Sequence, residues 1–126
     1  MKPSFYITVA IAALLAGGAQ AQLVIEKGSD DRINWKSLED FGAAHADLKG
    51  KSVSILAPWM GPDQELFTSI AAYFEDATGA KVNYSGSTSF EQQIVIDSEA
   101  GSPPDIGVLP QPGLAAELAA KGYLKD

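Results

Sequence analysis

The chain has 126 residues, of which 46% are hydrophobic and 20% charged, a composition typical of a single globular domain. Its formal net charge of −7 argues against nucleic acid as a partner, because phosphate binding needs clustered basic side chains. The complete lack of cysteine excludes disulfides, thiolate metal sites and thiol nucleophiles.

The first 21 residues have the pattern of a secretory signal peptide. Lys2 precedes an apolar run from Phe5 to Leu15, and the small-residue sequence Ala19-Gln20-Ala21 follows it. The run is shorter than the ~20 apolar residues of a transmembrane helix, which makes a retained anchor the weaker alternative. We expect cleavage after Ala21, which leaves 16 acidic and 8 basic side chains and a formal net charge of −8.

Residues 22–48 are expected to form an N-terminal extension. Leu23-Val24-Ile25 has the composition of a short edge strand. The only histidine, His45, lies among small and polar residues and is expected at the surface rather than in a catalytic or metal site. One helix face is indicated by three spaced apolar side chains: Trp35, Leu38 and Phe41.

Residues 49–126 alternate between two kinds of pattern. Short runs rich in β-branched residues and bounded by glycine or proline predict strands at 52–56, 81–85 and 105–109. An amphipathic segment follows each run and predicts a helix. This order, βαβαβα, predicts an α/β fold in which helices cover both faces of a parallel sheet.

The three predicted helices differ in their end signals. The first, 63–78, has acidic residues in its first turn and a glycine after its last. The second opens with a capping box, Ser89-Phe90-Glu91-Gln92, and runs to about Ala100. The third carries Leu114 and Leu118 on one side. The apolar face of the first helix is expected to comprise Leu66, Phe67, Ile70, Tyr73, Phe74 and Ala77.

Sequence motifs for catalysis are absent. The nucleophile elbow G-x-S-x-G, the dinucleotide motif G-x-G-x-x-G, the phosphate loop G-x-x-x-x-G-K and the zinc motif H-E-x-x-H do not occur. The carboxylates fall mostly on helix faces or in first turns, where solvation or the helix dipole explains them. We therefore expect no enzymatic activity, no catalytic residue, no metal and no cofactor.

Five segments carry a resemblance to a known family. They are Leu56–Leu66, Tyr73–Gly79, Ser89–Ile96, Gly101–Ile106 and Pro110–Ala115. Together they resemble the N-terminal portion of the α-glucoside-binding proteins of bacterial ABC transporters and, more broadly, the extracellular solute-binding proteins of family 1. The resemblance covers essentially all of the chain from Leu48 onward.

The resemblance implies that residues 49–126 form part of the first lobe of a type II periplasmic binding protein. Such a receptor captures a sugar in the periplasm between two lobes and hands it to membrane permease subunits, without covalent chemistry. Members of the family are several times longer, and the second lobe is missing here. The alternative is a secreted single-lobe interaction module or a non-functional fragment, and a reading frame continuing into a second lobe discriminates between them.

Candidate ligand-binding residues lie on loops that follow the strands, since parallel sheets bind ligands beyond the carboxyl ends of their strands. Trp59 offers an aromatic platform for the apolar face of a sugar, with burial under a neighbouring loop as the alternative. Asp63 and Gln64 follow Gly61 and Pro62 directly and can reach a sugar hydroxyl from the helix start. The helix dipole explains Asp63 equally well. Gly61 is the remaining candidate ligand-binding residue on this loop.

The other two loops contribute polar groups. Ser87 and Thr88 place hydroxyls at the start of the second helix, with ordinary solvent exposure as the alternative. Gln111 lies between two prolines that stiffen its loop, and a rigid turn without a ligand is its alternative. The turn Pro103-Pro104-Asp105 precedes the third strand and so belongs to the opposite edge, where a structural role is expected.

Overall fold

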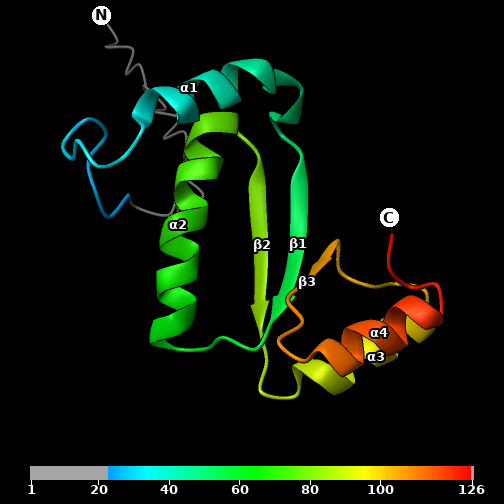
Figure 1. Cartoon of the computed structure of the whole chain (residues 1–126). Helices are drawn as coiled ribbons and strands as arrows, with labels where there is room; N and C mark the ends of the chain where they lie inside the picture. The colour runs from blue at the N-terminus through cyan, green and yellow to red at the C-terminus, as the bar shows by residue number, and fades with distance from the viewer. Residues whose placement is uncertain (1–22, 126) are drawn as a thin grey trace, which may run out of the picture.

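The computed structural model describes residues 23–125, so the predicted signal peptide and its cleavage after Ala21 lie outside the described residues. Figure 1 shows the elements along the chain. They are α1 (Trp35–Ala44), the 3-10 turn η1 (Ala46–Leu48), β1 (Ser52–Ala57), α2 (Pro62–Thr78), β2 (Lys81–Gly86), α3 (Phe90–Glu99), β3 (Ile106–Gly107) and α4 (Pro112–Ala120).

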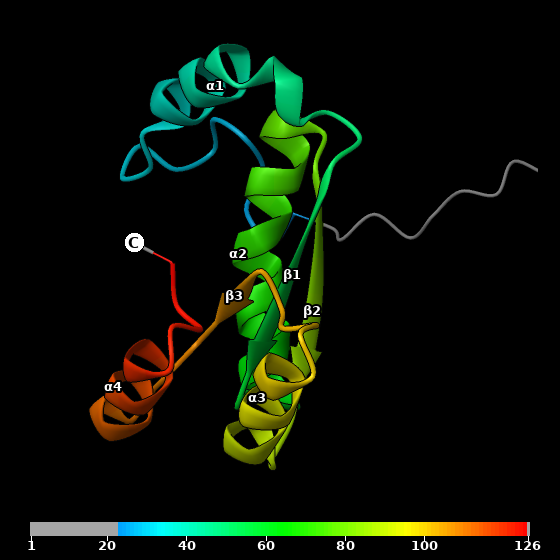
Figure 2. The same ribbon diagram turned by 90° about the vertical axis from the view of Figure 1, so that its right-hand side faces the viewer.

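The three strands form a parallel sheet in the order β2-β1-β3, which confirms the predicted α/β class. Six residues of β1 pair with β2, from Ser52 opposite Lys81 to Ala57 opposite Gly86. Because the chain steps from β1 to one side and then back to the other, right-handed crossovers place α2 and α3 on opposite faces. Figures 1 and 2 show α2 along the length of the β1–β2 pair, and α3 and α4 near the carboxyl ends of these strands.

The third strand is shorter than predicted. Instead of 105–109 it comprises Ile106 and Gly107, which lie opposite Ile55 and Leu56. Two prolines precede it and another follows at 110, so the flanking backbone lacks N–H groups for a longer ladder. One further bond, from Val108 N to Leu56 O at 3.0 Å, continues the pairing.

At the N-terminal end, the predicted edge strand Leu23-Val24-Ile25 is wrong, since these residues form no strand. The Tyr73 side chain of α2 holds this segment instead: Ile25 N donates to Tyr73 Oη at 2.7 Å, and Tyr73 Oη donates to Ile25 O at 2.9 Å. The helix predicted from Trp35, Leu38 and Phe41 is confirmed as α1.

Helix α1 packs across the C-terminal part of α2. The ring centroids of Trp35 and Tyr73 are 5.9 Å apart, and those of Phe41 and Phe74 are 6.3 Å apart. A Cβ atom at Gly42 would lie 2.1 Å from the carbonyl oxygen of Ala77, so the two backbones meet where only glycine fits.

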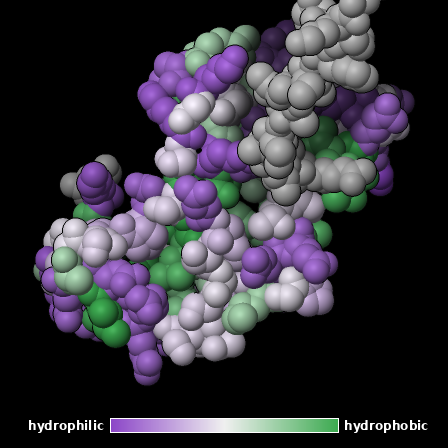
Figure 3. Space-filling model, turned by 180° about the vertical axis from the view of Figure 1, so that it is seen from behind, coloured by the Kyte–Doolittle hydropathy of each residue, from purple (hydrophilic) through white to green (hydrophobic). Residues whose placement is uncertain are grey.

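The apolar face predicted for α2 is wrong in part. Leu66 and Ile70 are 65% and 64% exposed, whereas Phe67 and Phe74 are half-buried and Ala72 is buried. The reason is the width of the sheet, because α2 lies over only two strands and the sheet covers one stripe of it. Seen from behind, hydrophobic surface gathers in a hollowed region between hydrophilic margins (Figure 3).

The most deeply buried cluster lies between β1 and the last two helices. Phe90 of α3 and Leu118 of α4 are 2% and 1% exposed and pack with Leu56 and Ile94. Three half-buried side chains close around them: Val95, Leu109 and Leu114. None of the helices between residues 23 and 125 is long and apolar enough to cross a membrane.

The capping box predicted at the start of α3 is wrong in its hydrogen bonds. Ser89 occupies the N-cap position, but its side chain makes no capping bond. Ser87 accepts hydrogen bonds from the backbone at the start of the helix. Its Oγ accepts from Ser89 N at 3.1 Å, and its carbonyl accepts from Phe90 N at 3.3 Å. Ser87 thus binds the Ser89 N–H that the Gln92 side chain would bind in a capping box.

Candidate functional site

The loops that follow β1 and β2 start side by side at the carboxyl edge of the sheet. Ser87 N donates to Ala57 O at 3.0 Å, which carries the β1–β2 pairing into the two loops. Gly61, the N-cap of α2, has φ of 58° and ψ of −130°, a conformation that side chains oppose. It turns the first loop sharply into the helix.

The Trp59 side chain is half-exposed at 36%, so it is not a core residue. Its ring packs on Phe67 of α2, with centroids 5.5 Å apart and planes tilted by 33°. Phe67 in turn packs on Tyr84 of β2 at 4.9 Å. The indole therefore has a fixed support and retains exposed surface, as an aromatic platform requires.

The backbone at Trp59 is held from β2. Tyr84 Oη donates to Trp59 O at 2.7 Å. A tyrosine hydroxyl is protonated at neutral pH and can donate this hydrogen bond, and burial raises the pKa of Tyr84 further above its ordinary value. A Cβ atom at Gly86 would lie 2.2 Å from the same carbonyl oxygen, so the loop rests directly against the end of β2.

A hollow of about 310 Å³ lies beside the indole. It is lined by Trp59, Asp63, Leu66, Phe67 and Ile70. Most of this lining is apolar, and the carboxylate of Asp63 adds one strong acceptor in the first turn of α2. Such a surface suits a ligand that combines an apolar face with hydroxyl groups.

The other predicted site residues divide into two groups. Gln64 is half-buried, and its Oε1 lies 3.0 Å from where a Cβ of Gly86 would be, so it lies at the residue that precedes Ser87 and the exposed Thr88 in the chain. Gln111, the N-cap of α4, is exposed, and its side chain makes no capping bond. The described contacts thus bring the first two loops together and leave Gln111 apart.

Two residues of this site, Phe67 and Tyr84, were missed as site residues from the sequence. The sequence predicts Phe67 on the apolar face of a helix and Tyr84 inside a strand. The sequence does contain a signal for Tyr84, because every second residue of a strand faces the same way. Residues 82, 84 and 86 therefore share one face of β2, and residues 84 and 86 lie near the end from which the loop leaves.

The described part of the chain is expected to hold no metal and to carry His45 at its surface. Between residues 23 and 125, no group of three or more His, Asp or Glu side chains could hold a metal ion. His45 is exposed, as expected, and stacks on Phe41 with ring centroids 4.4 Å apart.

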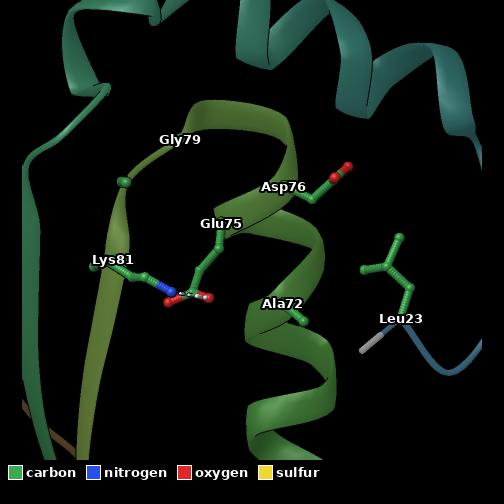
Figure 4. A pocket seen from close by; sticks show the side chains of 7 residues that line it. Leu23, Ala72, Glu75, Asp76, Gly79 and Lys81 are labelled. Carbon is green, nitrogen blue, oxygen red and sulfur yellow. Dashed lines mark ion pairs between the residues drawn. The ribbon is translucent and has the colours of Figure 1, made fainter. Parts of the chain in front are cut away.

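A second, smaller pocket of about 130 Å³ lies at the other end of α2 (Figure 4). Its main polar group, the carboxylate of Glu75, already accepts from Val82 N at 2.7 Å and pairs with Lys81 Nζ at 3.5 Å. Asp76 pairs with Lys27 beside it. Internal partners occupy these charges, which indicates a structural role for this pocket.

The fold and the loops together define a parallel α/β lobe that presents an aromatic and several polar side chains at the carboxyl edge of its sheet. The chain is 54% identical over 131 aligned residues to the alpha-glucosides-binding periplasmic protein AglE of Rhizobium meliloti (strain 1021), a match covering 98% of this chain and 28% of the relative. It is also 38% identical over 80 residues to the osmoprotective compounds-binding protein GgtB of Synechocystis sp., covering 64% of this chain and 19% of that protein.

These matches confirm the resemblance to solute-binding proteins, and both similar proteins bear the names of binding proteins rather than enzymes. The chain spans less than a third of the length of either relative. No family model matches the chain, and no solved structure matches it.

Proposed function

We propose that the chain is part of the first lobe of a periplasmic substrate-binding component of an ABC transporter for α-glucosides or related oligosaccharides. The observation that carries this proposal is the 54% identity to an α-glucoside-binding protein across 98% of the chain. The half-exposed indole of Trp59 supports it from the side of the geometry.

In this proposal the apolar face of a glucose ring lies on Trp59, which Phe67 supports from behind. Asp63 and Gln64 bind hydroxyls from the start of α2. Ser87 and Thr88 add further polar contacts from the second loop. Gln111 is the candidate from the third loop, and it reaches the sugar only if the ligand extends beyond the first two loops. The protein binds and releases its ligand unchanged and has no enzymatic role. Its partners are the sugar and the permease subunits that receive it.

Enclosure determines the affinity expected for this chain. Pocket ligands are usually buried over ~70 to 90% of their surface, whereas one lobe leaves a face of the sugar in water. We therefore expect this chain to bind an α-glucoside at least ~100-fold more weakly than a version extended with the remaining part of AglE, a factor that corresponds to ~2.7 kcal/mol.

The test is calorimetric titration of that extended protein with maltose, trehalose and sucrose. Trp59→Ala should weaken binding by ~1 to 3 kcal/mol and leave the melting temperature nearly unchanged. Trp35→Ala is the matched control, because Trp35 packs on Tyr73 away from the loops and should affect stability rather than affinity. Unchanged affinity in Trp59→Ala, or no binding of any α-glucoside by the parent, would contradict the proposal.

A further inference from the structure

Tyr84 makes a contact that its place in β2 does not require. Its ring packs on Phe67, which a core tyrosine would also do, but its hydroxyl leaves the sheet and donates to Trp59 O at 2.7 Å. The two residues are 25 positions apart and lie on different elements. The bond thus joins a strand to the loop that carries the exposed indole.

Three contacts converge on Trp59, the loop residue that carries the exposed indole. The hydroxyl of Tyr84 fixes its carbonyl, Phe67 supports its ring, and Gly86 leaves room for its backbone against β2. Phe67 touches both aromatic rings, so ring and carbonyl of Trp59 are tied to one stacked unit. A loop residue held at both ends in this way loses little conformational freedom when a ligand binds.

We propose that Tyr84 is a positioning residue for ligand recognition: its hydroxyl holds the carbonyl of Trp59, so that the indole stays on Phe67 with its free surface ready for the apolar face of a sugar. The role of the sugar rests on the function proposed above. The positioning of Trp59 by Tyr84 does not, and it can be tested without any ligand.

The test uses Tyr84→Phe, which keeps the ring on Phe67 and removes only the hydroxyl. In ¹⁵N NMR spectra of the 126-residue protein, the indole N–H of Trp59 should shift and the order parameter of its backbone amide should fall from ~0.85 toward ~0.6. The indole peak of Trp35 should stay in place. Trp35→Phe assigns the two peaks.

Tyr73→Phe provides the matched control. It also removes one hydroxyl from a half-buried tyrosine, but that hydroxyl bonds Ile25, near Trp35. It should therefore disturb the peak of Trp35 and spare that of Trp59. Gly86→Ala is a second variant: its Cβ would lie 2.2 Å from the Trp59 carbonyl oxygen, so it should displace this carbonyl and shift the same peak as Tyr84→Phe.

The two proposals separate in the outcome. If Tyr84→Phe and Gly86→Ala leave the Trp59 signals of the folded protein unchanged, the positioning role is wrong. Where the parent protein responds to α-glucoside at the Trp59 peak, Tyr84→Phe should weaken that response by ~3- to 10-fold, the range for one lost hydrogen bond. If the Trp59 signals change in the variants but the version extended with the remaining part of AglE binds no α-glucoside, positioning stands and the sugar-binding function falls.

Discussion

The sheet has a β1–β2 side, which α1 and α2 accompany, and a β3 side, which α3 and α4 accompany, and these two sides are stabilised in different ways. On one side, β1 and β2 pair along six residues, but the side chains buried there are mostly small, such as Ala57, Ala72 and Ala80. On the other side, β3 pairs through only two residues, yet Phe90 and Leu118 are the most deeply buried large side chains. The extent of backbone pairing is therefore no guide to the depth of packing.

This difference has a physical reason. A long register satisfies backbone N–H and C=O groups and fixes the strands, whereas hydrophobic stabilisation grows with the apolar area removed from water. The β1–β2 side relies mainly on backbone hydrogen bonds. The β3 side, with α3 and α4, relies mainly on buried apolar area. The two sides should thus respond differently to side-chain truncation.

The largest effect is expected for Phe90→Ala on the β3 side. Removing this 2% exposed ring should lower the free energy of unfolding by ~3 to 5 kcal/mol. Leu66→Ala, on the exposed face of α2, should change it by less than ~0.5 kcal/mol. Urea unfolding measures both. Similar losses for the two variants would mean that the buried cluster is not the main source of stability.

The next effect concerns the β1–β2 side, where α1 meets α2. Gly42→Ala would place a Cβ 2.1 Å from Ala77 O and force the helices apart, at a cost of ~1 to 3 kcal/mol. Hydrogen exchange should accelerate in α1 and remain slow in β1. Gly113→Ala is the control, because its Cβ would meet nothing within 4 Å. Unchanged exchange in α1 would contradict the close packing of the helices.

The two sides are also joined by a polar link, which predicts sensitivity to acid. Asp105 Oδ2 accepts from Ser54 N at 2.8 Å and from Ser54 Oγ at 2.7 Å, and these hydrogen bonds lower the pKa of the carboxyl below its ordinary value. A lowered pKa contributes stability above the unfolded value of ~3.9, and that contribution is lost as pH falls through the folded value.

Asp105→Asn keeps an acceptor for Ser54 but does not titrate. We expect its stability to decline less steeply than that of the parent below about pH 4. Thermal melts between pH 2 and 7 measure this slope. Ser54→Ala should flatten the slope as well and should also lower stability at pH 7, since it removes the hydroxyl that bonds the carboxylate. Parallel pH profiles for the parent and Asp105→Asn would remove this link from the comparison.

Much of the β1–β2 side could be predicted from the sequence, because its signals are local. The short length and glycine boundaries of β2, the apolar spacing of α2 and the glycine at 79 place these elements within a residue or two of their bounds in the structure. The β3 side was harder, since the length of β3 depends on the prolines around it and on its neighbour in space. The predicted edge strand at 23–25 is wrong for a similar reason, because a tyrosine hydroxyl 48 residues further along the chain holds this segment.

The candidate site shows the same limit. The loops could be placed from the ends of the strands, and Trp59 could be chosen because it follows a strand rather than lying within one. The support of Trp59 by Phe67 and Tyr84 could not be predicted from the sequence, because this support depends on how α2 lies over β2. Sequence thus indicates which groups reach an edge, and the packing determines which of them are held.

The smallest effect is expected where the structure corrects the sequence, at the start of α3. Ser87→Ala removes the oxygen that accepts from Ser89 N and should destabilise the protein by ~0.5 to 1 kcal/mol. Ser89→Ala should have almost no effect, because its hydroxyl makes no capping bond. Both variants delete one serine hydroxyl just before α3 begins at Phe90, so neither changes the helix propensity within α3. Urea unfolding of the pair resolves the difference, and a greater loss for Ser89→Ala would restore the capping box that the sequence predicts.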